Sequence, residues 1–154
     1  MNTDAASQTS LAPLVKRLTV PCTAQRAVDI FTDQIAAWWP LPTHSVGGDH
    51  AVSVRLEGRV GGQIVETIDD GRTAVWGTVT TWDPPSRVAF TWHPGQPPQE
   101  ATSVEVTFEP DGPSALVTLT HDGWGNRPDG QAARRAYDTG WDTVLGGFVA
   151  QAGR

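Results

Sequence analysis

The sequence lacks the residues that several common kinds of site require. It contains one cysteine, Cys22, which excludes an intrachain disulfide and a CxxC-type zinc or redox site. The four histidines are scattered and form no HxH or HExxH motif, so we expect no metal site. There is no P-loop, no G-x-G-x-x-G after a strand and no G-x-S-x-G elbow. We therefore expect no cofactor and find no specific support for a serine nucleophile.

The sequence also lacks long apolar runs and an excess of basic over acidic residues. No run approaches the roughly 18 apolar residues of a membrane span, and residues 1–12 lack the features of a signal peptide, so the cytoplasm is the expected location. The net charge is −6, with a single lysine among the 11 basic residues. This charge argues against nucleic acid, whose phosphates attract basic proteins, and against an anionic membrane surface.

A length of 154 residues, 38% of them hydrophobic, indicates one globular domain. Residues 1–12 are small and polar and are predicted to form a disordered N-terminal tail, which leaves residues 13–154 as the single domain.

The first part of the domain combines a strand with a helical segment. Leu14–Val20 alternates as a short strand does. Thr23 can cap a helix that starts at Ala24, and this helix or helix pair is predicted to end before Pro40. A loop follows over 40–49, and it could form the mouth of a cavity.

The middle of the chain has the period of two that is typical of half-buried strands. Turn signals such as Asp69-Asp70-Gly71 separate the segments, and hairpin turns predict antiparallel pairing. Each strand has one apolar face, so one side of the sheet is predicted to be covered. The six predicted strands are 50–57, 63–67, 73–82, 87–93, 102–109 and 115–121.

One long helix is predicted over Gln131–Ala152 as the cover of this sheet. Gly140, Gly146 and Gly147 lie inside it, which indicates either a late bend or close packing against a neighbour. The fold class is therefore α+β, with a curved antiparallel sheet gripping a helix. The large apolar residues of one helix face are Tyr137, Trp141, Val144 or Leu145, and Phe148.

Seven tryptophans either pack the core or also line a cavity, and both interpretations stay open. His121 ends an apolar strand face, so it is either a polar group in such a cavity, able to act as acid or base, or a buried histidine with local partners. Four glutamates are spaced as strand surface residues, namely Glu57, Glu66, Glu105 and Glu109.

Several motifs together resemble one protein family. The run 76–92 fits G-x-V-x-x-x-x-P-P-x-x-[LV]-x-[FY]-x-W, and 59–62 reads R-x-G-G. LTHxGW occurs at 119–124, GWxxxL at 140–145, and Trp-Trp-Pro at 38–40. In this order they resemble the homologues of the activator of the heat-shock-protein-90 ATPase, in the START-like or SRPBCC (pollen-allergen-like) superfamily.

The resemblance spans residues 14 to 150 and implies the helix-grip fold. In that fold a curved antiparallel sheet wraps around a long C-terminal helix, with one or two short helices after the first strand and a cavity between sheet and helix. The superfamily includes lipid binders, hormone binders and polyketide cyclases. The eukaryotic co-chaperone has a separate N-terminal domain for which this chain has no room, which counts against chaperone activation.

Three functional hypotheses follow. The first is a small protein that binds an apolar or aromatic small molecule in the cavity. The second is a cyclase- or hydrolase-type enzyme that uses the same cavity with His121 as acid or base, and the third is a co-chaperone-like interaction domain. A homodimer formed through an edge strand or a helix is compatible with all three. The expected ligand-binding residues are Trp39, Trp76, Phe90, Trp92, His121, Tyr137 and Trp141.

Overall fold

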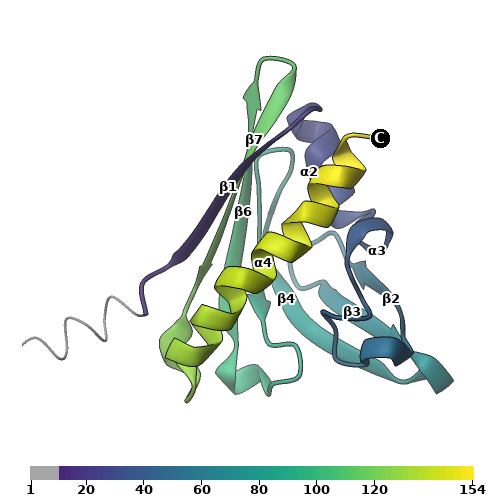
Figure 1. Cartoon of the computed structure of the whole chain (residues 1–154), viewed down its shortest axis with the longest axis vertical. Coiled ribbons are helices and arrows are strands. Elements are labelled where there is room, and N and C mark those ends of the chain that lie inside the picture. Colours follow the sequence, from purple (N-terminus) through teal and green to yellow (C-terminus); the bar gives the residue numbers. More distant parts are fainter. Residues whose placement is uncertain (1–10) are drawn as a thin grey trace, which may run out of the picture.

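The computed structural model describes residues 11–154, so the predicted tail at 1–12 lies almost entirely outside the described residues. Within this part, a curled antiparallel sheet partly encloses a long helix (Figure 1). The predicted helix-grip fold is confirmed. The strands are β1 (Leu14–Val20), β2 (Ala51–Leu56), β3 (Gln63–Ile68), β4 (Thr73–Asp83), β5 (Arg87–Trp92), β6 (Thr102–Asp111) and β7 (Ser114–Asp122), and the helices are α2 (Ala24–Thr32), α3 (Ile35–Trp38) and α4 (Gly130–Ala152).

The seven strands follow the order β1-β7-β6-β5-β4-β3-β2, and every neighbouring pair is antiparallel. All six predicted hairpin strands are present, because short turns return the chain to the strand just completed. The first strand closes the other edge by pairing with β7, where Leu14 lies opposite His121. The described sheet therefore contains no parallel crossover.

The segment before Pro40 forms two short helices. The side chain of Thr23 accepts a hydrogen bond from the backbone N–H of Arg26 at 3.1 Å, which confirms the predicted N-cap. Trp38 turns inward as a plug, because its indole N–H donates to the carbonyl of Ile30 at 2.8 Å. Its ring packs 5.4 Å from that of Phe148, so α3 is joined to α4 through the core.

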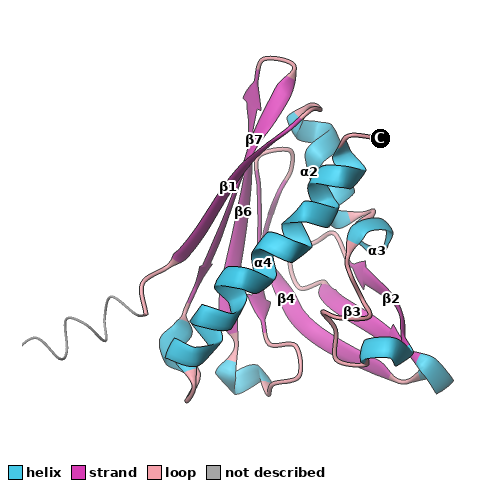
Figure 2. Cartoon of the chain, in the orientation of Figure 1, coloured by secondary structure: helices cyan, strands magenta, loops and turns pink. Residues whose placement is uncertain are grey.

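Helix α4 crosses the inner face of the curled sheet (Figure 2). Its predicted stripe is buried at Trp141, Val144, Leu145 and Phe148, with both Val144 and Leu145 at 5% exposure or less, whereas Tyr137 is partly buried. Asp129 occupies the N-cap position, but its carboxylate binds Arg127 instead of the helix N–H groups. In the part of the chain that the structure describes, no helix is both long and apolar enough to cross a membrane.

Strand β4 lies between β3 and β5. Its register with β3 covers Thr73–Thr78 and its register with β5 begins at Val79, and the carbonyl of Trp76 also accepts from the N–H of His93 at 2.6 Å. Gly77 lies at this point, and a Cβ atom there would be 1.7 Å from the carbonyl oxygen of Thr91. Only glycine allows this close approach, which places Trp76 and Trp92 side by side on the inner face.

Two adjacent glycines of α4 give a matched test of the packing between α3 and α4. A Cβ at Gly147 would lie 2.5 Å from the carbonyl oxygen of Trp38, whereas a Cβ at Gly146 would meet nothing within 4 Å. We expect Gly147→Ala to lower the free energy of unfolding by roughly 1–3 kcal/mol through overpacking. Gly146→Ala should raise it by up to about 1 kcal/mol through helix propensity. Urea unfolding of both variants measures the difference, and equal effects would contradict close packing at Gly147.

Candidate functional site

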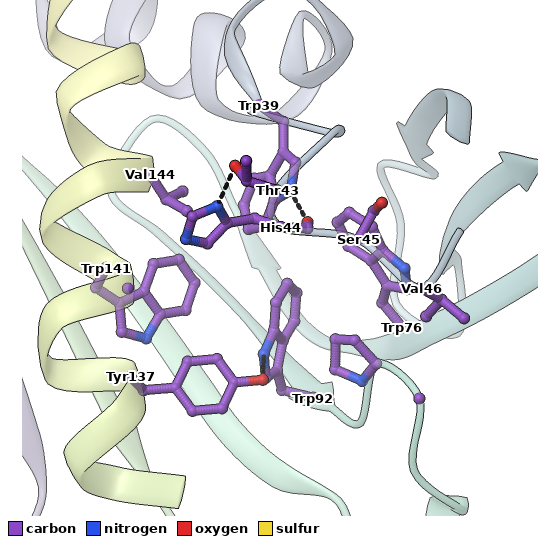
Figure 3. A pocket seen from close by; sticks show the side chains of 13 residues that line it. Trp39, Thr43, His44, Ser45, Val46, Trp76, Trp92, Tyr137, Trp141 and Val144 are labelled. Atoms are coloured by element: carbon purple, nitrogen blue, oxygen red, sulfur yellow. Dashed lines mark hydrogen bonds between the residues drawn. The ribbon is translucent and has the colours of Figure 1, made fainter. Parts of the chain in front are cut away.

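A cavity of about 340 Å³ lies between α4, the ends of β4 and β5, and the loop that follows α3 (Figure 3). We call residues 40–49, the loop predicted as a cavity mouth, the mouth loop. It contributes four consecutive lining residues, while α4 supplies the opposite wall. The lining consists of Trp39, Thr43, His44, Ser45, Val46, Trp76, Trp92, Pro94, Gly95, Tyr137, Gly140, Trp141 and Val144.

Four tryptophans form a continuous aromatic wall. The ring centroids of Trp39 and Trp76 are 5.0 Å apart, those of Trp76 and Trp92 5.6 Å, and those of Trp92 and Trp141 5.7 Å. All five neighbouring ring pairs among these tryptophans are tilted or edge-on, the arrangement that aromatic quadrupoles favour. The wall therefore presents ring faces and edges to whatever occupies the cavity.

Each indole N–H of this wall is held by a specific acceptor. Trp39 donates to the carbonyl of His44 at 2.6 Å, and Trp92 donates to the hydroxyl of Tyr137 at 3.0 Å. The indole of Trp76 donates to Glu66 at 2.8 Å and that of Trp141 to His121 at 2.9 Å. These bonds fix the ring orientations and leave the apolar ring surfaces toward the cavity.

Tyr137 and His44 are the polar groups best placed for a ligand. Burial raises the pKa of Tyr137, so its phenol is protonated at neutral pH. Its oxygen accepts from Trp92, which leaves its own O–H free to donate to a ligand. The Nδ1 atom of His44 lies 2.7 Å from the hydroxyl of Thr43. Its Nε2 atom makes no hydrogen bond within residues 11–154 and faces α4 at Gly140.

His121 is fully buried, and both of its ring nitrogens are occupied. Because an indole N–H only donates, Nδ1 is the acceptor from Trp141, and the ring proton is on Nε2. Nε2–H then donates to the hydroxyl of Thr102 at 2.7 Å, which donates to the carbonyl of Trp92 at 3.1 Å. Burial, helped by the positive charge of Arg127, lowers the pKa of His121 to about 3, so the imidazole is neutral at pH 7.

Five of the seven predicted binding residues line the cavity, and two do not. Phe90 lies beside the wall, with its ring centroid 5.7 Å from that of Trp92. His121 supports the wall from outside the lining through Trp141. The five that line it are Trp39, Trp76, Trp92, Tyr137 and Trp141.

The lining residues of the mouth loop are absent from the predicted set. His44 entered the sequence-based predictions only as one of four scattered histidines without a metal motif, although the predicted cavity mouth at 40–49 was the signal that could have identified it. The assignment of Glu66 to the strand surface is wrong, because this residue is 0% exposed. The bulge in this ladder lies on β4, where Trp76 is the extra residue opposite Ile64 and Val65, so β3 keeps its alternation. Glu66 therefore shares a buried face with Ile64 and Ile68. Residues 11–154 contain no cluster of histidine, cysteine or acidic side chains that could hold a metal ion.

The chain matches one protein-family model over residues 23–153, described as "Activator of Hsp90 ATPase homolog 1-like protein". Among curated proteins, none matches it significantly in sequence.

Solved structures resemble the chain over most of its length. An anthrahydroquino-gamma-pyrone synthase, Txn09, solved in complex with a compound designated SUM, is 31% identical, with a TM-score of 0.59 and coverage of 80% of this chain and 84% of that chain. The Aha1 dimer from Colwellia psychrerythraea is 18% identical (TM-score 0.65, coverage 90% and 93%). CalU16 from Micromonospora echinospora is 17% identical (TM-score 0.63, coverage 91% and 74%). The last two similarities show the fold alone.

The buried His121 predicts acid sensitivity. The unfolded chain protonates this histidine below a pH of about 6.5, whereas the native state resists protonation down to a pH of about 3. The unfolded state therefore binds more protons in this window. The stabilisation is complete above pH 6.5 and decreases on acidification by up to about 1.4 kcal/mol per pH unit.

His121→Gln should remove this component, because glutamine can accept from Trp141 and donate to Thr102 without titrating. Urea unfolding of both proteins at pH 7.5, 6 and 5 measures the difference. Parallel pH dependences, or an NMR titration of His121 with an ordinary midpoint, would contradict the assignment.

Proposed function

The chain belongs to the family of Activator of Hsp90 ATPase homolog 1-like proteins, and on this premise we propose that it binds a compact aromatic small molecule in its cavity. The observation that carries the proposal is the wall of four tryptophans around a space of about 340 Å³. Apolar pockets with a few convergent polar groups are the usual form of small-molecule sites. We keep the cytoplasm as the expected location.

The size and lining of the cavity narrow the class of ligand. Its volume is near the lower end of the roughly 300–1,000 Å³ that is typical of ligand pockets, which favours a molecule of two or three fused rings. A flat ring system would pack against the indoles of Trp39 and Trp92. The O–H of Tyr137 would donate to a carbonyl or phenol oxygen of the ligand, and Nε2 of His44 would meet a hydroxyl group.

A filled-cavity variant tests the binding site without removing any existing contact. A Cβ at Gly140 would find its nearest neighbour, His44 Nε2, at 3.9 Å, so Gly140→Leu should extend into the cavity while favouring the helix. We expect it to weaken binding of 1,8-dihydroxyanthraquinone at least tenfold, measured by quenching of tryptophan fluorescence. Gly146→Leu, on the exposed side of the same helix, is the matched control and should bind as the wild type does. Equal affinity in both variants would place the probe elsewhere.

A second candidate function, ring closure on an aromatic substrate, is favoured by the 31% identity to a protein named as a gamma-pyrone synthase. The earlier hypothesis gave the acid-base role to His121. Both nitrogens of His121 are occupied, and it lies outside the cavity lining. His44 suits the role better, because its Nε2 is unoccupied within the described chain and Thr43 orients its other nitrogen.

The chemistry would be a cyclodehydration. Nε2 of His44 would take the proton of a phenol as its oxygen adds to a ketone carbon, while Tyr137 donates a hydrogen bond to the ketone oxygen. The new C–O bond gives a cyclic hemiketal, and loss of water leaves a γ-pyrone. General acid-base catalysis of this kind contributes typically about 10²–10⁴-fold to the rate.

The test uses 1-(2-hydroxyphenyl)butane-1,3-dione, which closes to a chromone by this route. If the chain is a cyclase, the wild type accelerates closure over buffer, and His44→Gln lowers the rate by roughly 10²-fold or more. His121→Gln is the control for an indirect effect and should change the rate little. Closure no faster than in buffer would leave the binding function alone, and an unchanged rate in His44→Gln would remove His44 from the chemistry.

The family description also keeps the co-chaperone-like interaction domain as a third hypothesis. This function would not need the cavity. If this chain captures a heat-shock-protein-90 homologue, and Gly140→Leu captures it equally well, an interaction surface separate from the cavity is supported.

A further inference from the structure

Glu66 is a buried acidic residue that the proposed chemistry does not use. It lies in β3 at 0% exposure, although glutamate is rarely found fully buried. Within the described chain it forms no ion pair. Its carboxylate instead accepts three hydrogen bonds, each of 2.8 Å: Oε1 accepts from the indole N–H of Trp76 and the backbone N–H of Val46, and Oε2 accepts from the backbone N–H of Gly47.

These three donors come from the two sides of the cavity. Trp76 belongs to the aromatic wall on β4, and Val46 belongs to the mouth loop. The other hydrogen bonds of the mouth loop are local. The hydroxyl of Ser45 donates to Leu41 and accepts from the N–H of Gly48, for example. In residues 11–154, the bonds to Glu66 are the only hydrogen bonds that join the mouth loop to a strand of the sheet.

We propose that Glu66 is the positioning residue of the cavity, which holds the mouth loop and the Trp76 ring in one fixed relation. It thereby places Val46, and His44 two residues before it, opposite Tyr137. The consequence for ligand binding rests on the proposed function, whereas the attachment of the mouth loop to the sheet does not depend on a ligand.

The chemistry of the three donors explains why the position needs a carboxylate. A carboxylate is an acceptor at both oxygens, whereas a glutamine side chain places an NH₂ donor at one of them. In Glu66→Gln, one of the N–H groups of Val46, Gly47 or Trp76 must face another donor. Bonds from N–H groups to a charged acceptor are also stronger than neutral ones, so the isosteric variant should loosen the loop without changing the volume of the core.

Amide hydrogen exchange tests the loop by itself. In the wild type, the amides of Val46 and Gly47 should exchange at least about tenfold more slowly than that of Ser45, which has no acceptor in the described chain. In Glu66→Gln, this local protection should fall at least tenfold at one or both amides. Amides of the β6–β7 ladder should keep their protection, which distinguishes loss of the hydrogen bonds between Glu66 and the mouth loop from general destabilisation.

Glu105→Gln is the matched control, because Glu105 also lies on a strand but its side chain is 44% exposed. The binding readout is the affinity for 1,8-dihydroxyanthraquinone, which we expect to fall at least fivefold in Glu66→Gln and to stay unchanged in Glu105→Gln. A loss of protection with unchanged affinity would overturn the positioning role toward a ligand.

The two proposals can fail separately. If the wild type does not bind the probe, exchange at Val46 and Gly47 still decides whether Glu66 holds the loop. If these wild-type amides exchange as fast as that of Ser45, the proposal that Glu66 holds the mouth loop is overturned. This result needs no variant, so it stands even where Glu66→Gln does not fold. Unchanged protection in a folded Glu66→Gln would overturn it equally.

Discussion

The attachment of helix α4 to the sheet depends on a closed circuit of hydrogen bonds. Trp141 donates to His121, His121 to Thr102, and Thr102 to the carbonyl of Trp92. The indole of Trp92 then donates back to the helix at Tyr137. Tyr137 and Trp141 are four residues apart and thus on one face of the helix, so β5, β6, β7 and α4 are joined through a single network.

The tryptophans of this network turn their apolar ring surfaces toward the cavity and their hydrogen-bonding groups away from it. Tryptophan suits this arrangement because its ring is a large apolar surface and its N–H is a single donor that needs one acceptor. A phenylalanine wall would have a similar apolar character, but it would lack the bonds that set the ring angles. A preformed wall also lowers the entropy lost on binding. Among residues 11–154, no buried side-chain polar atom is left without a partner.

Two buried titratable residues support this wall in opposite ways. His121 is neutral and both donates and accepts, and it connects the helix to the sheet. Glu66 only accepts, and it connects the mouth loop to the sheet. Neither belongs to the cavity lining. The groups left for contact with a ligand are those on the other side of the same network, above all Tyr137 and His44.

The sequence by itself determined the architecture and much of the wall. Period-two segments joined by turn residues predict an antiparallel sheet, and the apolar stripe from Tyr137 to Phe148 predicts its covering helix, because both patterns are local and repeat. The four tryptophans of the wall and Tyr137 could be predicted as lining residues for the same reason, since large aromatics on inward faces meet near the helix. Several motifs in the right order, including the one around Gly77, indicated the family.

Only the tertiary structure decided which polar residues matter. His121, at the end of an apolar strand face, is the histidine that the sequence favours, but it is enclosed by Trp141 and Thr102, whereas His44 borders the cavity. Glu66 has the charge of a surface residue, but it shares a buried face of β3 with Ile64 and Ile68, and the mouth loop covers it. The position of that loop depends on contacts between residues distant in sequence, which no local pattern encodes.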